Sequence, residues 1–299
     1  MRTVGSVSVS VSVSAAVVVT DSTAYLPEGF ADRQSVAVVP LHVLVDQDSS
    51  LDGVDFGPAE LAKALDERRT VTTSRPTPAE FAASYQAALR AGASGVVSVH
   101  LSRDLSGTWE AARLAAEEIN NRAGATVVRV VDSRTTGMGL GFAVLAAAKA
   151  AAAGAEPSEV ERVAVDVASR TRTMFCLQTL EHLRRGGRIG PTAALVGSAL
   201  AVKPLLHVSG GRILPLEKVR TTSRALTRLV ELTVAAAGDG PVGIAVHHLG
   251  SPERAAELAT RLAERLPNAA GCLVSEVGAV IGAHTGMGVL GVVVLPGGL

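Results

Sequence analysis

The sequence contains few aromatic residues, few cysteines and no excess of either charge, and each shortage argues against a class of protein. Among 299 residues there are one Trp, two Tyr and five Phe, so stacking surfaces for single-stranded nucleic acid are poorly supplied. Lys+Arg and Asp+Glu each total 28, and this zero net charge argues against a nucleic-acid partner, which needs a basic face. Cys176 and Cys272 have no metal-ligand spacing and form no disulfide framework. We therefore expect a reduced, cytoplasmic protein.

Long apolar runs are also missing, and no segment approaches the ~18 consecutive apolar residues of a membrane helix. We therefore expect no stable membrane insertion. The N-terminal stretch VGSVSVSVSVSAAVVVT alternates serine with valine, whereas the core of a secretory signal is continuously apolar. Residues 1–15 are predicted to be a Val/Ser extension that is poorly ordered or forms an edge strand.

Short β-branched runs alternate with alanine-rich helical patterns along the chain, which predicts an α/β fold with a mostly parallel sheet flanked by helices. A change in composition at residues 151–157 separates an N-terminal α/β domain, residues 16–157, from a C-terminal α/β domain, residues 158–299. The predicted strands are 16–20, 36–39, 95–99, 126–131, 174–177, 205–208, 242–247, 273–276 and 288–294. The predicted helices are 58–69, 78–90, 108–122, 140–153, 159–170, 223–236 and 252–265.

Polar turns follow three of the predicted parallel strands: residues 21–23, 102–108 and 132–133. In open sheets of this kind, ligands bind beyond the carboxyl ends of the strands, so these turns are expected to converge on one edge. The turn HLSRDLSGTW at 100–109 holds more hydroxyls than one helix cap requires. Ser106, Gly107 and Thr108 combine a hydroxyl, an unhindered backbone and a helix start, which suits an anion. A plain capping turn is the alternative.

Two further segments have the residues to contact an anion. In TSRPTP at 73–78, Thr77 is placed to cap the helix that begins at Pro78, which leaves Thr73 and Ser74 as ligand candidates. His284 lies in the glycine-dense segment GAHTGMGVLG, where an imidazole could donate to a carboxylate or serve only in packing. Asp21 either forms an Asx-turn or assists a reaction at the site. The spacing of histidines and carboxylates predicts no metal site.

A series of short motifs in fixed order resembles the DegV family, the fatty-acid-binding subunits of bacterial fatty acid kinase. In the first half they are VTDSTAYLP at 19–27, VPL at 39–41, DGV at 52–54, TSRP at 73–76, LSGT at 105–108, DS at 132–133 and MGLG at 138–141. In the second half they are LRRGGRI at 183–189, KPLL at 203–206, VRT at 219–221 and GAHTG at 282–286. Each motif is weak alone, but together they extend over residues 17 to 295.

The resemblance implies a two-domain DegV-like fold, in which the second, smaller α/β domain has a mixed sheet. It further implies a long-chain fatty acid bound between the domains, with its carboxylate phosphorylated by a separate ATP-dependent kinase subunit. The protein would then be a carrier for phospholipid synthesis, without a cofactor and without catalysis of its own. Carried over by motif, Thr73, Ser74, Ser106, Gly107 and His284 form the carboxylate site. Arg185, Arg188 and Arg220 are the candidates for kinase docking or phosphate stabilisation.

The chain departs from the family pattern at three positions: Arg75 stands where glutamine is usual, Met287 where one version has proline, and Trp109 where tyrosine is commoner. The Val/Ser extension has no counterpart in the family. An arginine beside Thr73 adds a positive charge near the expected carboxylate. A serine hydrolase acting on acyl esters is the alternative function, with a triad of Ser106, His284 and Asp21 or Asp132. LSGT does not match the G-x-S-x-G elbow of α/β-hydrolases. A small-molecule sensor is a third possibility, without a DNA-binding motif to support it.

Overall fold

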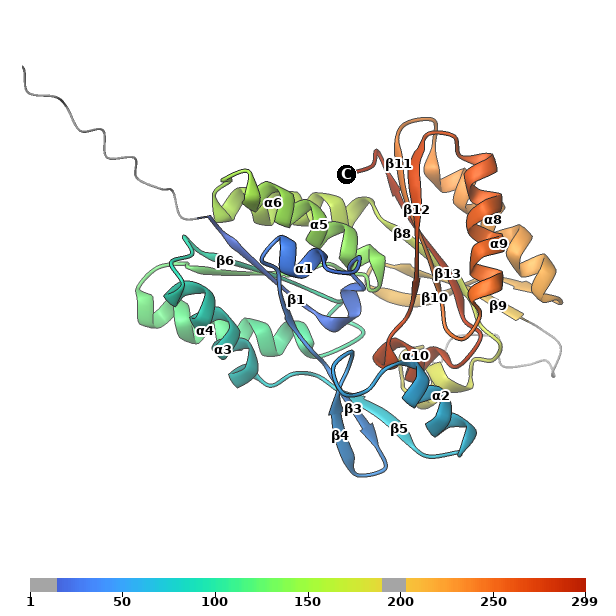
Figure 1. The fold of residues 1–299 in the computed structure, drawn as a ribbon, viewed down its shortest axis with the longest axis horizontal. Helices are drawn as coiled ribbons and strands as arrows, with labels where there is room; N and C mark the ends of the chain where they lie inside the picture. The colour runs from blue at the N-terminus through green and yellow to red at the C-terminus, as the bar shows by residue number, and fades with distance from the viewer. Residues whose placement is uncertain (1–14, 190–202) are drawn as a thin grey trace, which may run out of the picture.

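The computed structural model describes residues 15–189 and 203–299, which form three β-sheets with helices on their faces (Figure 1). The first 14 residues of the expected Val/Ser extension lie outside the described residues. The predicted fold class is confirmed: one sheet is parallel, a second is mixed, and helices flank both. Within residues 15–189 and 203–299, no helix has both the length and the apolar character that a membrane crossing requires.

The N-terminal sheet is fully parallel, with the strand order β2-β1-β6-β7. Its strands are β2 (Ala37–Val39), β1 (Val17–Asp21), β6 (Val96–His100) and β7 (Val128–Asp132). Helices α3 (Pro78–Arg90) and α4 (Thr108–Ala123) cover one face, and α5 (Met138–Ala152) and α6 (Pro157–Arg170) cover the other (Figure 1). Thr77 caps α3 as predicted, because its hydroxyl accepts the amide of Glu80 while the Glu80 carboxylate accepts the amide of Thr77.

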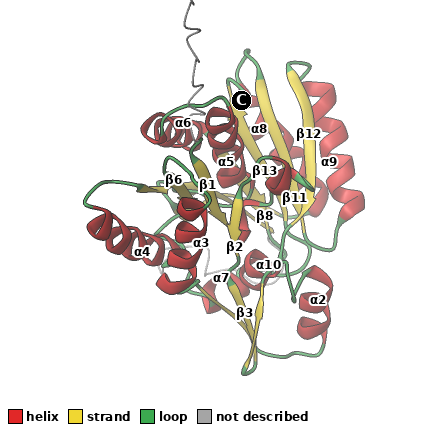
Figure 2. Cartoon of the chain, turned by 60° about the vertical axis from the view of Figure 1, so that its left-hand side comes forward, coloured by secondary structure: helices red, strands yellow, loops and turns green. Residues whose placement is uncertain are grey.

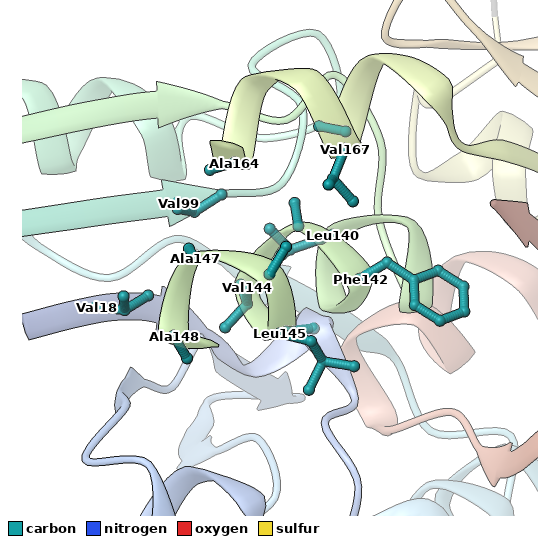
Figure 3. Packing of buried hydrophobic residues seen from close by; sticks show 14 of the residues in the cluster. Val18, Val99, Leu140, Phe142, Val144, Leu145, Ala147, Ala148, Ala164 and Val167 are labelled. Atoms are coloured by element: carbon teal, nitrogen blue, oxygen red, sulfur yellow. The ribbon is translucent and has the colours of Figure 1, made fainter. Parts of the chain in front are cut away.

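Helix α5 is the centre of the largest core cluster (Figure 3). Leu140 and Val144 pack against Val99 of the sheet on one side, and Ala164 and Val167 of α6 belong to the same cluster. A helix buried on all sides must be apolar on all sides, which explains the alanine-rich sequence of α5. The predicted domain division at residue 157 stays a prediction. Helix α6, which begins at that residue, packs in the same core as α5.

The C-terminal sheet has six strands in the order β10-β9-β8-β13-β11-β12, and every pair is antiparallel except β11 with β12. Its strands are β8 (Arg172–Cys176), β9 (Lys203–Ser209), β10 (Arg212–Val219), β11 (Val242–His248), β12 (Ala269–Glu276) and β13 (Leu290–Pro296). Helices α8 (Thr222–Ala237) and α9 (Pro252–Arg265) cover the face turned away from the N-terminal sheet (Figure 2).

A third, antiparallel sheet was not predicted from the sequence. It has the order β4-β3-β5 and consists of β3 (His42–Val45), β4 (Asp48–Leu51) and β5 (Val71–Ser74). The short helices α1 (Phe30–Arg33), α7 (Glu181–Arg185) and α10 (Ala279–Thr285) were also missed, as was the 3-10 turn η1 (Ser22–Ala24). The predicted helix α2 (Pro58–Asp66) packs with α10 beside this sheet (Figure 1).

Candidate functional site

A cavity of about 860 Å³, counting its opening to solvent, lies where the three sheets meet. Its wall takes residues from the loops at the carboxyl edge of the N-terminal sheet, from β5 and α10, and from the inner face of the C-terminal sheet. Most of these residues are apolar: Leu41, Leu101, Leu105, Phe175, Leu183, Val208, Ile213, Val277, Val280, Ile281, Val289 and Val292. The predominantly apolar wall, with a few polar side chains among it, fits a small-molecule site.

Thr73 and His284 meet in the wall of this cavity. Thr73 Oγ1 and His284 Nε2 are hydrogen-bonded at 2.8 Å, although the residues are 211 positions apart. Thr73 lies on β5, where successive side chains point to opposite faces, so Thr73 faces inward while Ser74 is exposed. Ser74 Oγ contacts the carbonyl of Arg75 at 3.4 Å. The two neighbouring candidates are therefore separated by the strand geometry, and Thr73 is the one at the cavity.

His284 is neutral at pH 7 in this environment. Burial, together with the nearby charge of Arg188 and the neighbouring His182, lowers the pKa of His284 to about 4. A neutral imidazole contributes one N–H donor and one acceptor nitrogen, and no charge. A cation for a carboxylate must then come from another residue.

Arg188 supplies a positive charge in the cavity wall. Its Nε donates to the carbonyl of Leu105 at 3.1 Å, and Nη1 donates to the carbonyl of Gly186. Burial lowers the pKa of Arg188, but an arginine keeps its proton at neutral pH. Of the three arginines expected to serve docking or phosphate stabilisation, Arg188 alone is among the described residues that line the cavity.

The glycines of the motif RRGGR have a steric role. A Cβ on Gly186 would collide with Nδ1 of His284, so the backbone after α7 approaches the imidazole as only glycine permits. Gly187 follows with φ of +69°, a left-handed conformation that turns the chain toward Arg188. In the same way, a Cβ on Gly286 would collide with the ring of His182. The glycines of the RRGGR and GAHTG motifs therefore let α7 and α10 approach each other closely.

Ser106 forms the turn before α4, and its place in the cavity wall leaves the ligand role a prediction. Its Oγ accepts the amide of Thr108 at 3.3 Å and is hydrogen-bonded to Thr108 Oγ1 at 2.8 Å, which is a turn at the start of α4. Ser106 also lines the cavity. Gly107 is the N-cap, and a Cβ there would collide with the guanidinium of Arg75. The exposed Arg75 therefore lies over the turn that carries Ser106, with its positive charge beside this site.

Asp21 organises the turns around the cavity. Its Oδ1 accepts the amide and the hydroxyl of Thr23, as expected for an Asx-turn, and its Oδ2 accepts the amide of Leu101 at 3.0 Å. Oδ2 also lies 3.0 Å from His100 Nδ1, and both side chains are fully buried. Because Thr23 and Leu101 line the cavity, Asp21 fixes two of its walls.

The model of the DegV family, described as uncharacterised proteins, matches residues 15–297 of the chain. The chain belongs to the DegV family. A DegV domain-containing protein of Streptomyces coelicolor is 53% identical over 277 residues, which are 93% of this chain and 97% of that protein. The resemblance stated from the motifs is thereby confirmed.

Two solved DegV structures share the fold at more than 30% identity. A DegV family protein from Thermus thermophilus, described by its fatty acid binding, has a TM-score of 0.88 and 33% identity and covers 94% of this chain and 99% of its own. DegV from Bacillus subtilis, described as a fatty acid binding protein, has a TM-score of 0.84 and 31% identity, with 94% and 99% covered.

The hydrogen bonds of this DegV chain are not those of the triad considered for a serine hydrolase. His284 Nε2 is bonded to Thr73, and Asp21 is bonded to His100. Asp132 Oδ1 accepts the backbone amides of Arg103 and Arg134. Each member of the proposed triad therefore has a different partner.

The remaining candidates lie at the surface. Arg185 is exposed and forms an ion pair with Glu181 one turn earlier in α7, at 2.5 Å. Arg220 is exposed after the end of β10. Among residues 15–189 and 203–299, no group of three His, Cys, Asp or Glu side chains is placed to hold a metal ion.

Proposed function

We propose that this DegV protein binds a long-chain fatty acid in the cavity between its sheets. The carboxylate lies at Thr73, Ser106, His284 and Arg188, and the acyl chain lies against the apolar wall. The observation that carries the proposal is an apolar cavity with hydroxyls, an imidazole and one guanidinium gathered in its wall. The Thermus and Bacillus relatives, described as fatty acid binding, support it.

The finer part of the proposal concerns the fate of the bound acid. A carrier would present the carboxylate to an ATP-dependent fatty acid kinase subunit, which forms the acyl phosphate for phospholipid synthesis. The neutral His284 and the charged Arg188 suit this role. They would hold the carboxylate with hydrogen-bond donors and one positive charge, and the carboxylate would stay ionised. Arg185 and Arg220, both exposed, would contact the kinase.

Filling the cavity is expected to abolish fatty acid binding without unfolding the protein. Val208 lines the cavity from β9, so a Val208→Trp substitution would occupy the space of the acyl chain. Titration of delipidated protein with stearic acid, followed by calorimetry, should show no binding. Leu214→Trp is the matched control, because Leu214 is exposed on the adjacent β10 and should leave binding unchanged. Equal affinities for the two variants would contradict the proposal.

Removing the charge of Arg188 is expected to erase the preference for an acid over an alcohol. The wild-type protein should bind stearic acid more tightly than stearyl alcohol, and Arg188→Gln should weaken acid binding by roughly 10- to 100-fold, from about 1.5–3 kcal/mol for a charge-assisted hydrogen bond. Alcohol binding should change little. Competition against a fluorescent fatty acid measures both affinities.

Arg185→Gln is the control for this substitution, since Arg185 is exposed and paired with Glu181. It should leave the affinity for stearic acid as it is. In a reconstituted reaction with an ATP-dependent kinase subunit, the same variant should slow acyl phosphate formation. A loss of acid binding in Arg185→Gln, or none in Arg188→Gln, would contradict the assignment of the two arginines.

A further inference from the structure

The wall of the cavity contains a second polar patch, which the carboxylate site leaves unexplained. Thr136, in the loop before α5, and Thr173, on β8, both line the cavity. They lie on elements other than β5, α10 and the turn before α4, which carry Thr73, His284 and Ser106. A saturated acyl chain has no group that could pair with a hydroxyl at this position.

The hydroxyl of Thr136 has no hydrogen-bond partner among residues 15–189 and 203–299, although the oxygen is buried. A buried hydroxyl without a partner destabilises a protein, because the hydrogen bonds it made to water are not replaced. Thr173 Oγ1 is only weakly engaged, since it lies 3.3 Å from Thr135 Oγ1, longer than the usual 2.7–2.8 Å between hydroxyl oxygens. Two hydroxyls in this patch therefore retain capacity for another oxygen.

His247 lies beside the patch and has no such capacity. Its Nε2 accepts the amide of Met138 at 2.9 Å, and Nδ1 is hydrogen-bonded to Ser275 Oγ at 2.9 Å. Both ring nitrogens are thus occupied within the protein. Two other threonines of the cavity wall are similarly satisfied: Thr23 is bonded to Asp21, and Thr285 donates to the carbonyl of Ile281 at 3.0 Å. Among the described threonines that line the cavity away from the carboxylate site, free hydrogen-bonding capacity is left at Thr136 and Thr173.

We infer that the cavity is built for an acyl chain that carries a hydroxyl group along its hydrocarbon tail. This inference rests on the proposed fatty acid binding and names the class of acid. The Thr136 hydroxyl donates to the oxygen of the substituent, and that substituent donates to Thr173 Oγ1. A site with a polar group left unpaired by the wrong ligand discriminates more strongly than an apolar pocket that merely tolerates the right one.

The test compares stearic acid with a series of monohydroxylated stearic acids that carry the hydroxyl at successive carbons. Delipidated full-length protein is titrated with each acid in competition with a fluorescent fatty acid. At least one isomer is expected to bind about tenfold more tightly than stearic acid. Thr136→Val, which keeps the side-chain shape, should reduce that preference to less than about twofold. Its melting temperature should not fall, because the unpartnered hydroxyl is removed.

Thr285→Val is the matched control, since it removes a cavity-lining hydroxyl that is already bonded within α10. It should keep the preference for the hydroxylated acid. The inference is overturned if no isomer binds better than stearic acid, or if Thr285→Val reduces the preference as much as Thr136→Val. If stearic acid and all its hydroxylated isomers fail to bind, the proposed function itself fails.

Discussion

Lowering the pH from 6.5 to 4 is expected to reduce the free energy of unfolding by about 3 kcal/mol for each of His247 and His284. The pKa of each is about 4 in the folded protein, against 6.5 for an ordinary histidine. Between these values the unfolded chain binds a proton that the folded chain does not. The contribution of these two histidines to the free energy of unfolding is therefore complete above pH 6.5. It falls as the pH drops and levels off below about pH 4.

The cause is clearest at His247. Burial lowers the pKa of His247, and the neighbouring His248 lowers it further. Its Nε2 accepts the amide of Met138 at the start of α5, which requires an unprotonated nitrogen. A proton on Nε2 would remove this hydrogen bond and add a positive charge at the positive end of the helix dipole. Since His247 is on β11, this bond joins the C-terminal sheet to the central helix of the N-terminal core.

Chemical denaturation of the delipidated protein at a series of pH values measures this effect. His247→Gln and His284→Gln should each flatten the pH dependence between 6.5 and 4, and the double variant should flatten it most. Taking the difference from wild type removes the contribution of carboxylates that titrate in the same range. If the double variant shows the same pH dependence as wild type, these histidines are not the neutral, buried groups described here.

Substituting the polar head site is the second change with a large expected effect. Thr73→Val and His284→Ala should each weaken the binding of stearic acid by about 1.5–3 kcal/mol, or roughly 10- to 100-fold. Each removes a group from the 2.8 Å pair in the cavity wall, and Thr73→Val also leaves His284 Nε2 without its partner. Calorimetric titration of the delipidated variants gives the affinities.

Ser74→Ala provides the control for Thr73→Val within the same strand. The two hydroxyls are adjacent in sequence, but Ser74 points to the exposed face of β5. Its removal should leave the affinity unchanged. An effect of Ser74→Ala equal to that of Thr73→Val would mean that the carboxylate is not held on the inner face of this strand.

The main layers of the fold could be predicted from the sequence because their signals are local. Helices α3 and α9 begin and end where predicted, since Pro78 and Pro252 mark their first turns. The sheet of β3, β4 and β5 was missed because the sequences of β4 and β5, DSSL and VTTS, lack a clear apolar alternation. Such strands form through pairing with each other rather than through their own sequence pattern.

The candidate site shows the same division between local and long-range information. Thr73, Ser106 and His284 could be proposed from motifs, yet the 2.8 Å contact of Thr73 with His284 depends on β5 and α10 meeting across 211 residues. The close approach of Gly186 to His284 was also missed. Two glycine-rich segments, each with a histidine nearby, were the only signal for it. The unpartnered oxygen of Thr136 has no sequence signal, because hydrogen bonding depends on the folded surroundings.

The most direct test of fatty acid binding is native mass spectrometry of the wild-type protein purified from bacteria without delipidation. The predicted spectrum shows a mass increase that matches one long-chain fatty acid, released intact when the protein is denatured. Val208→Trp, purified in parallel, should show the mass of the chain alone. A wild-type protein that carries no acyl ligand and takes up none when incubated with stearic acid would contradict the proposed function.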